Sequence, residues 1–222
     1  MKLLSSPKQN FSNLMAQKGN FLALVYASLA FQCAITFGVV AYLRAHPTLN
    51  KEISKYFWLW FIIAICLILL LTIRSLPTPV RFLLLCIFSF FISLNCIAAS
   101  MYVSEYLIKS ILVATLGVFV TMTLLGFGLA SMGIHLGFMT YLLICSLIGL
   151  LVALLVTIFI PLPSIVYKAI LAFGMTLFSI FIAYDTNVIL QKNYNRDFVS
   201  ASIDLYLDVF NLFTQMIAFN EY

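Results

Sequence analysis

Residues 198–219 of the chain read FVSASIDLYLDVFNLFTQMIAF, an apolar stretch long enough to cross a membrane that carries two aspartates, Asp204 and Asp208. A third aspartate, Asp185, lies in the apolar stretch before it, whereas the five earlier apolar stretches carry no charge. An ionised carboxylate near the centre of a bilayer costs about 2.5–3.5 kcal/mol even on the lenient insertion scale. We therefore expect the function to depend on these three acids.

The polar residues of this stretch are periodic. Asp204, Asp208, Asn211 and Gln215 are spaced by four, three and four residues, which places them on one face of a helix. Because a polar stripe facing lipid would be costly, this face is predicted to look into a helix bundle. A seam of hydrogen bonds between helices would also explain such a face. Two aspartates one turn apart oppose each other, however, which favours a functional interpretation.

The composition indicates a polytopic membrane protein, because 64% of the 222 residues are hydrophobic and only 9% are charged. The sequence predicts an all-α membrane protein with seven transmembrane helices in a single domain, residues 21–219. A short polar arm, residues 1–20, precedes this domain, and a short tail, residues 220–222, follows it. The first helix is predicted to be a permanent span rather than a removed signal. The seven predicted spans are residues 21–43, 56–73, 82–103, 110–134, 136–160, 169–190 and 198–219.

Several function classes are disfavoured by the distribution of charge and of metal-binding residue types. All twelve basic residues lie outside the apolar stretches, scattered among short segments, so no nucleic-acid surface is expected. Their distribution only weakly favours a cytoplasmic N-terminus. The chain has neither a Cys/His metal spacing nor a motif of an intramembrane hydrolase. We expect neither an enzyme nor a tightly bound cofactor.

Hairpin geometry places Asp185 opposite Asp208. If the last turn is centred near Asn195, the two aspartates differ in depth by roughly 5 Å at 1.5 Å per residue, which helix tilt can absorb. Two carboxylates that share a site of low dielectric constant cannot both ionise without a large cost. The sequence therefore predicts a carboxyl pair that senses pH.

A basic residue at the end of the second span is a candidate partner for this pair. Arg74 is predicted to lie on the same side of the membrane as the last turn, from which it would latch the pair by an ion pair. Arg74 would equally serve, together with Arg81, as a positively charged interfacial flank. Protonation of the pair would weaken the latch but would also remove calcium ligands, and these two effects oppose each other.

Four short motifs resemble those of a known family: Val25–Ser28, Tyr184–Thr186, Ile203–Asp208 and Asn211–Phe213. In order and spacing they are similar to the transmembrane Bax inhibitor motif proteins, and the last three are the specific part. The resemblance implies a bundle of six helices around a central seventh, which forms a pH-sensitive calcium leak. It implies that Asp185 and Asp208 are the paired sensor, that Arg74 is the latch in the closed form, and that Asp204 takes part in calcium release. Eukaryotic members protect against cell death by lowering the calcium load of internal stores.

Two departures from the family pattern affect these expectations. Ile63 stands near the position of an acid that some bacterial members carry on the second helix, so the gating network is expected to differ in detail. The lysine-rich tail of animal members does not follow residue 219. Either an endomembrane of the endoplasmic reticulum or Golgi type or a bacterial inner membrane fits the remaining pattern.

The chemistry of the acids agrees with a calcium pathway. Calcium prefers several oxygen ligands, which Asp185, Asp204, Asp208 and Asn211 can supply transiently to a transported ion. We predict a passive calcium leak whose partners are the lipid bilayer, calcium and protons. Two alternatives remain, of which the first uses the same acids and the second uses the surface of the bundle. A proton/calcium antiporter would move calcium against its gradient, and a non-conducting adaptor would bind cell-death regulators or a second copy of the chain.

Overall fold

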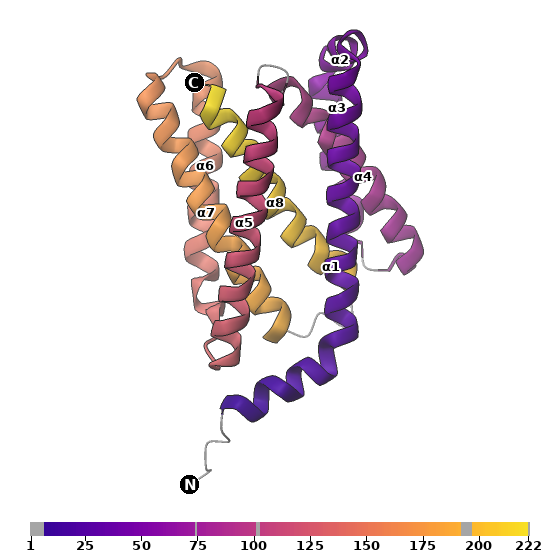
Figure 1. The fold of residues 1–222 in the computed structure, drawn as a ribbon, viewed down its shortest axis with the longest axis vertical. Helices are drawn as coiled ribbons and strands as arrows, with labels where there is room; N and C mark the ends of the chain where they lie inside the picture. Colours follow the sequence, from indigo (N-terminus) through magenta and orange to yellow (C-terminus); the bar gives the residue numbers. More distant parts are fainter. Residues whose placement is uncertain (1–6, 74, 101–102, 192–196, 222) are drawn as a thin grey trace.

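The computed structural model describes residues 7–73, 75–100, 103–191 and 197–221, and every regular element in these ranges is a helix (Figure 1). The predicted all-α class is therefore confirmed. The elements in order are α1 (Pro7–Ala45), α2 (Pro47–Ser54), α3 (Phe57–Leu71), α4 (Thr78–Ser100), α5 (Glu105–Ser131), η1 (Leu136–Met139), α6 (Thr140–Phe159), α7 (Ser164–Gln191) and α8 (Phe198–Glu221).

The helices have the length and apolarity of membrane spans. Within the described residues, α1, α4, α5, α6 with η1, and α7 can each cross a membrane, and α2 with α3 makes a sixth span if this pair, bent by 71°, is counted as one. Large apolar side chains cover the outside of these helices, among them Val113, Leu124 and Leu142. Such a surface is stable only against lipid, so the chain is a multi-pass membrane protein.

The short helix α2 lies between the first two predicted spans, where the sequence pattern indicates only a connection. Pro47 stands in its first turn, where a missing backbone N–H costs nothing. Leu49 and Ile53 lie one turn apart and share a face, while Lys51 and Glu52 are exposed on the other side. This amphipathic pattern allows α2 to lie across the end of the bundle where α1 ends and α3 begins (Figure 1).

The end of α5 is set by a glycine. Gly133 has a φ of 74°, a left-handed conformation that residues with a Cβ rarely adopt. The N–H of Gly133 donates to Ala130 O at 3.0 Å and that of Ile134 donates to Leu129 O at 3.0 Å. These two bonds form a Schellman motif, which satisfies the last carbonyls of α5 and turns the chain towards η1.

Helix α8 packs against α7, α1, α4 and α5. In Figure 1 it crosses the molecule diagonally, between α1 and α4 on one side and α6 and α7 on the other. Its apolar residues Leu205, Leu212 and Ile217 are fully buried, and the buried Tyr206 Oη lies 2.6 Å from Thr36 Oγ1 of α1. Helix α8 therefore buries many of its apolar side chains, although it carries two of the three acids.

Candidate functional site

Half of the polar stripe of α8 is buried in the interior, as the spacing predicted for the whole stripe. Asp208 and Gln215 are 5% and 7% exposed, and Asp204 and Asn211 are half-buried. A helix with two acids and two amides is tolerated in a membrane because neighbouring helices cover that face.

Asp208 lies next to Asp185 of α7. The two side chains are within hydrogen-bonding contact, and Asp204, one turn earlier on α8, adds a neighbouring negative charge. The structure thus brings together the two aspartates that hairpin geometry placed opposite each other. A hydrogen bond between two carboxyl groups needs a proton on one of them, because an ionised carboxylate can only accept. The arrangement suits a pair that holds one proton.

Several buried oxygens around this pair have no hydrogen bond among the described residues. They include Asp208 Oδ2 and the hydroxyl oxygens of Tyr26, Thr123 and Thr186. Tyr26 Oη lies near the hydroxyls of Thr123 and Thr186, and Thr186 follows Asp185 directly in the sequence. Buried polar oxygens in proteins are normally paired with protein groups, water or ions. Hydroxyl groups of α1, α5 and α7 therefore gather at Thr186, the residue after Asp185, and Asp208 Oδ2 is a buried acceptor on α8.

The basic residue that holds the neighbouring helices is Arg81. Its Nη1 lies 2.7 Å from Asp197 Oδ1, and its Nη2 donates to Leu71 O and to Ser200 Oγ, each at 3.0 Å. Arg81 is 5% exposed, so it is not the interfacial flank that the sequence suggested. Arg74, the predicted latch, lies outside the described residues. The guanidinium of Arg81 thus contacts Asp197, the residue before α8, in the ion pair given above.

Asp197 caps the start of α8. Its Oδ1 accepts from Ser200 N at 3.2 Å and its Oδ2 accepts from Ser200 Oγ at 2.8 Å. Partial burial alone would raise the pKa of Asp197, but the hydrogen bonds from Arg81 and Ser200 outweigh it, and the pKa lies below its ordinary value. Asp197 is therefore ionised at neutral pH and the ion pair with Arg81 is intact.

Comparison with known proteins identifies the family. A sequence model described as "Inhibitor of apoptosis-promoting Bax1" matches residues 18–219, which includes all three aspartates. The chain belongs to the Bax inhibitor family. It is 30% identical to Bax inhibitor 1 of Schizosaccharomyces pombe over 202 residues, which cover 89% of this chain and 74% of the relative. It is 28% identical to Protein LIFEGUARD 4 of Arabidopsis thaliana over 207 residues, covering 89% and 82%.

A shorter match links this Bax inhibitor family chain to a viral protein. The Golgi anti-apoptotic protein of vaccinia virus is 44% identical over 50 residues, covering 22% of this chain and 21% of the relative. This name and that of Bax inhibitor 1 describe regulators rather than enzymes. The family resemblance carried by the C-terminal motifs is confirmed.

The three aspartates do not form a compact metal site. Within the part of the chain that the structure describes, no group of three or more His, Cys, Asp or Glu residues is arranged to hold a metal ion. Asp185 and Asp208 contact each other, and Asp204 acts on them as a nearby charge. The transient three-aspartate calcium site therefore stays a prediction.

Asn187 is a site residue that the sequence analysis missed. This fully buried amide donates to Ile134 O at 3.0 Å and Gly126 O at 3.4 Å, and it accepts from Leu136 N at 3.1 Å. It thereby fixes α7, two residues after Asp185, against α5 and η1. Its position in the same predicted span as Asp185 could have identified it, because a polar side chain inside a membrane is almost always paired.

A glycine of α5, Gly126, allows this helix to approach α7 closely beside Ala183 and Thr186. A Cβ on Gly126 would lie 2.5 Å from Ala183 O and 2.9 Å from Thr186 Cβ. Real Cβ atoms essentially never come this close to a backbone oxygen. The small residue and Asn187 together hold the helix that carries Asp185 in one position.

Proposed function

We propose that the chain is a pH-sensitive calcium leak channel whose gate is the Asp185/Asp208 pair. The observation that carries the proposal is the contact between these two carboxyl groups, which come from different helices of a membrane protein. In addition, Asp208 Oδ2 is buried and has no hydrogen bond among the described residues. Calcium is the transported ion, and no tightly bound cofactor is part of the proposal.

The gate is proposed to respond to loss of the shared proton. With one proton, the pair is a hydrogen bond that joins α7 to α8. Without it, two negative charges oppose each other in a low-dielectric site, so the helices separate or a cation enters between them. Deprotonation also turns both groups into ligands that calcium prefers. Calcium flux is therefore expected to increase as the pH rises through the titration of the pair.

Arg81 fixes the start of α8 in this proposal, because it contacts Asp197 and Ser200. An arginine that latched the pair would give the opposite trend, since protonation would then release the pair and open the gate. Arg74 as such a latch stays a prediction, and a calcium flux that falls as the pH rises would favour it.

The pathway is proposed to follow α8. Asp204 and Asn211 lie one turn before and almost one turn after Asp208, and both are half-buried. The seven-helix arrangement with six helices around this one stays a prediction, and the contacts of α8 with α1, α4, α5 and α7 are compatible with it. Binding along such a path must be weak, because a leak has to release the ion.

In a eukaryotic setting the leak would lower stored calcium and oppose cell death. The names Bax inhibitor 1 and Golgi anti-apoptotic protein, borne by two relatives, support this role. They favour a membrane of the endoplasmic reticulum or Golgi type over a bacterial inner membrane. Contacts with cell-death regulators or with a second copy are compatible with the same role.

The proposal is tested with the purified chain in liposomes that contain a calcium dye and a proton dye. Calcium should enter down its gradient at a rate above that of protein-free liposomes, without a proportional movement of protons. A fixed ratio of proton to calcium flux would identify an antiporter instead. Absence of calcium flux at every pH would reject the channel and favour the adaptor.

A further inference from the structure

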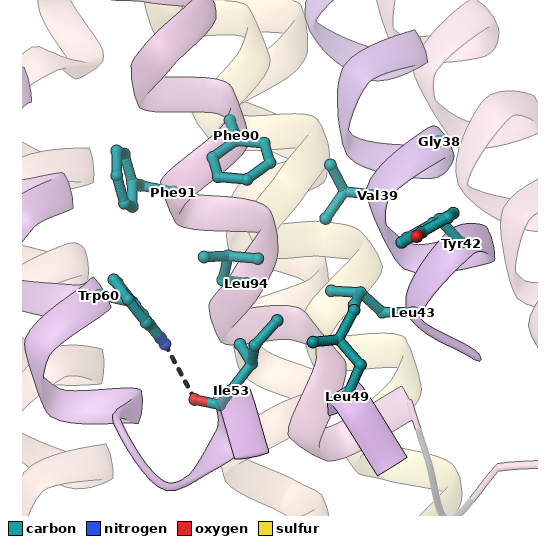
Figure 2. A pocket seen from close by; sticks show the side chains of 10 residues that line it. All are labelled: Gly38, Val39, Tyr42, Leu43, Leu49, Ile53, Trp60, Phe90, Phe91 and Leu94. Atoms are coloured by element: carbon teal, nitrogen blue, oxygen red, sulfur yellow. Dashed lines mark hydrogen bonds between the residues drawn. The ribbon is translucent and has the colours of Figure 1, made fainter. Parts of the chain in front are cut away.

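A second feature of the molecule lies on the opposite side of α1 from α5, between α1, α2, α3 and α4. It is a cavity of about 410 Å³, and Figure 2 shows side chains from all four helices around it. Its volume falls in the range of small-molecule binding sites, about 300–1,000 Å³. The aspartate pair does not line it.

The lining of this cavity is almost entirely hydrocarbon. Its ten residues are aliphatic or aromatic, apart from Gly38, and Tyr42 supplies the only hydroxyl group among them. In Figure 2, Leu49 and Ile53 of α2 lie at one end, and Phe90 of α4 lies at the other. A polar or charged ligand would find no partner here and would lose its hydration, so the occupant must be apolar.

Contacts between the helices hold the wall of the cavity in place. The indole N–H of Trp60 donates to Ile53 O at 2.9 Å, which ties α2 to the first turn of α3 (Figure 2). Trp60 also stacks on Phe91 of α4, with 5.8 Å between ring centroids. These contacts hold the end formed by α2 over the space between α1 and α4. A preformed wall reduces the ordering cost of binding.

The rim of the cavity is continuous with the lipid-facing surface. Tyr42, Leu49 and Phe90 line the cavity and are also 58%, 41% and 44% exposed. Since the chain is a multi-pass membrane protein, the medium outside this rim is the hydrocarbon of one leaflet. The outward side of α2 carries the exposed cations Lys51 and Lys55, the second paired with Glu52 at 2.7 Å. These cations suit the phosphate of a lipid whose chain lies below α2.

We propose that this cavity is a binding site for one acyl chain of a membrane phospholipid. The chain enters from the leaflet between α1 and α4 and lies against Trp60 and Phe91, with its headgroup beside α2. A lipid bound in this way fills the space between two helices that both pack on α8, and it stabilises the folded bundle by mass action.

The test uses the full-length chain in liposomes that contain a small fraction of phospholipid with a photoreactive diazirine in mid-chain. After illumination, crosslinks are mapped by mass spectrometry. Crosslinks to residues 38–43 and 90–94 should be several-fold more frequent than crosslinks to the exposed apolar residues of α6. Equal labelling of the two regions would overturn the proposal.

A cavity-filling variant makes the test specific. A Cβ on Gly38 would meet no atom within 4 Å, so the leucine side chain of Gly38→Leu can occupy part of the cavity without a clash at its Cβ. This variant should lower the cavity crosslinks several-fold and leave those of α6 unchanged. Gly117→Leu is the matched control, because Gly117 is an exposed helical glycine with equally open space, away from the cavity. Unchanged cavity labelling in Gly38→Leu would contradict the proposal.

Two further arms of the experiment separate misfolding and sterol binding from the binding of an acyl chain. Gly38→Val repeats the test with a smaller side chain if Gly38→Leu does not fold, as judged by its thermal unfolding in detergent. A photoreactive sterol is added in parallel liposomes. If the sterol labels residues 38–43 and 90–94 and displaces the phospholipid label, the site is a sterol site and the acyl-chain proposal is overturned.

Discussion

Arg81 Nη1 and Asp197 Oδ1 lie 2.7 Å apart, which joins the first turns of α4 to the residue before α8. The same guanidinium donates to Leu71 O at the end of α3. One side chain therefore ties three helices at one end of the bundle. Asp208 lies eleven residues further along α8, roughly 16 Å at 1.5 Å per residue. Arg81 therefore fixes one end of the helix whose middle carries Asp208.

Removal of this cation should destabilise the protein strongly. The side chains of Arg81 and Asp197 are 6% and 12% exposed, so Arg81→Met leaves a largely buried carboxylate without its partner. The expected loss is about 3–5 kcal/mol in the free energy of unfolding. Lys109→Met is the control, because it breaks an ion pair whose side chains are 71% and 75% exposed and should therefore change the stability little. Equal thermal stability of the two variants in detergent would show that the Arg81 contact contributes little.

The ion pair of Arg81 and Asp197 makes the stability of the protein depend on pH. Because the folded-state pKa of Asp197 is lowered, its stabilising effect is present above the unfolded pKa, about 3.9, and is lost as the pH falls through the folded value. Asp197→Asn lacks this titration. Thermal unfolding measured from about pH 3 to pH 7 should show a wild type that is more stable at neutral pH, and the difference should shrink below about pH 4. A difference that stays constant over this range would contradict the assignment.

Close approach of α5 and α7 predicts opposite effects at two glycines of one helix. Gly126→Ala forces a Cβ against Ala183 O, and overpacking of this kind costs about 1–3 kcal/mol. Gly128→Ala meets no atom within 4 Å, so it should be neutral or stabilise the helix by up to about 1 kcal/mol. Unfolding of the two variants in detergent gives the comparison, and equal stability would mean that the helices can separate without cost.

Loss of the Asn187 amide should leave the Leu136 N–H without a partner. Asn187→Ala removes the acceptor of Leu136 N and one of the two side-chain donors to Ile134 O, which also accepts from Gln191 Nε2 at 3.0 Å. Each buried group left unsatisfied costs about 1–3 kcal/mol. Asn220→Ala removes an exposed amide bond to Met216 O and should change stability little. Hydrogen exchange at residues 134–136 should increase in the first variant only, and unaltered exchange there would contradict the role of Asn187.

The sequence predicted the parts of this molecule that depend on helical periodicity. The spacing of the acids and amides on α8 was enough to place Asp208 and Gln215 inside, whereas Asp204 and Asn211 lie at the less buried edge of the stripe. The contact of Asp185 with Asp208 followed from the short turn between two spans, since helix rise fixes which residues share a depth.

The contacts between distant segments were not predictable in the same way. Arg81 resembles any basic residue that flanks a span, and only the fold brings it to Asp197. Helix α2 is short and mostly polar, so the sequence pattern indicates a loop there, although Pro47 and the apolar pair Leu49 and Ile53 are typical of a helix. The cavity beside α2 depends on that helix and was not predictable for the same reason.

The central claim is that protonation of the Asp185/Asp208 pair controls calcium flux. The most direct measurement is calcium entry into liposomes from about pH 5.5 to pH 8, because two coupled carboxyl groups lose their protons in separate steps. It compares the wild type, Asp208→Asn and the control Glu105→Gln, which removes an exposed carboxylate. The account predicts that flux increases with pH in the wild type and the control, and that it becomes independent of pH in Asp208→Asn. An Asp208→Asn protein that keeps the wild-type pH dependence would contradict the account.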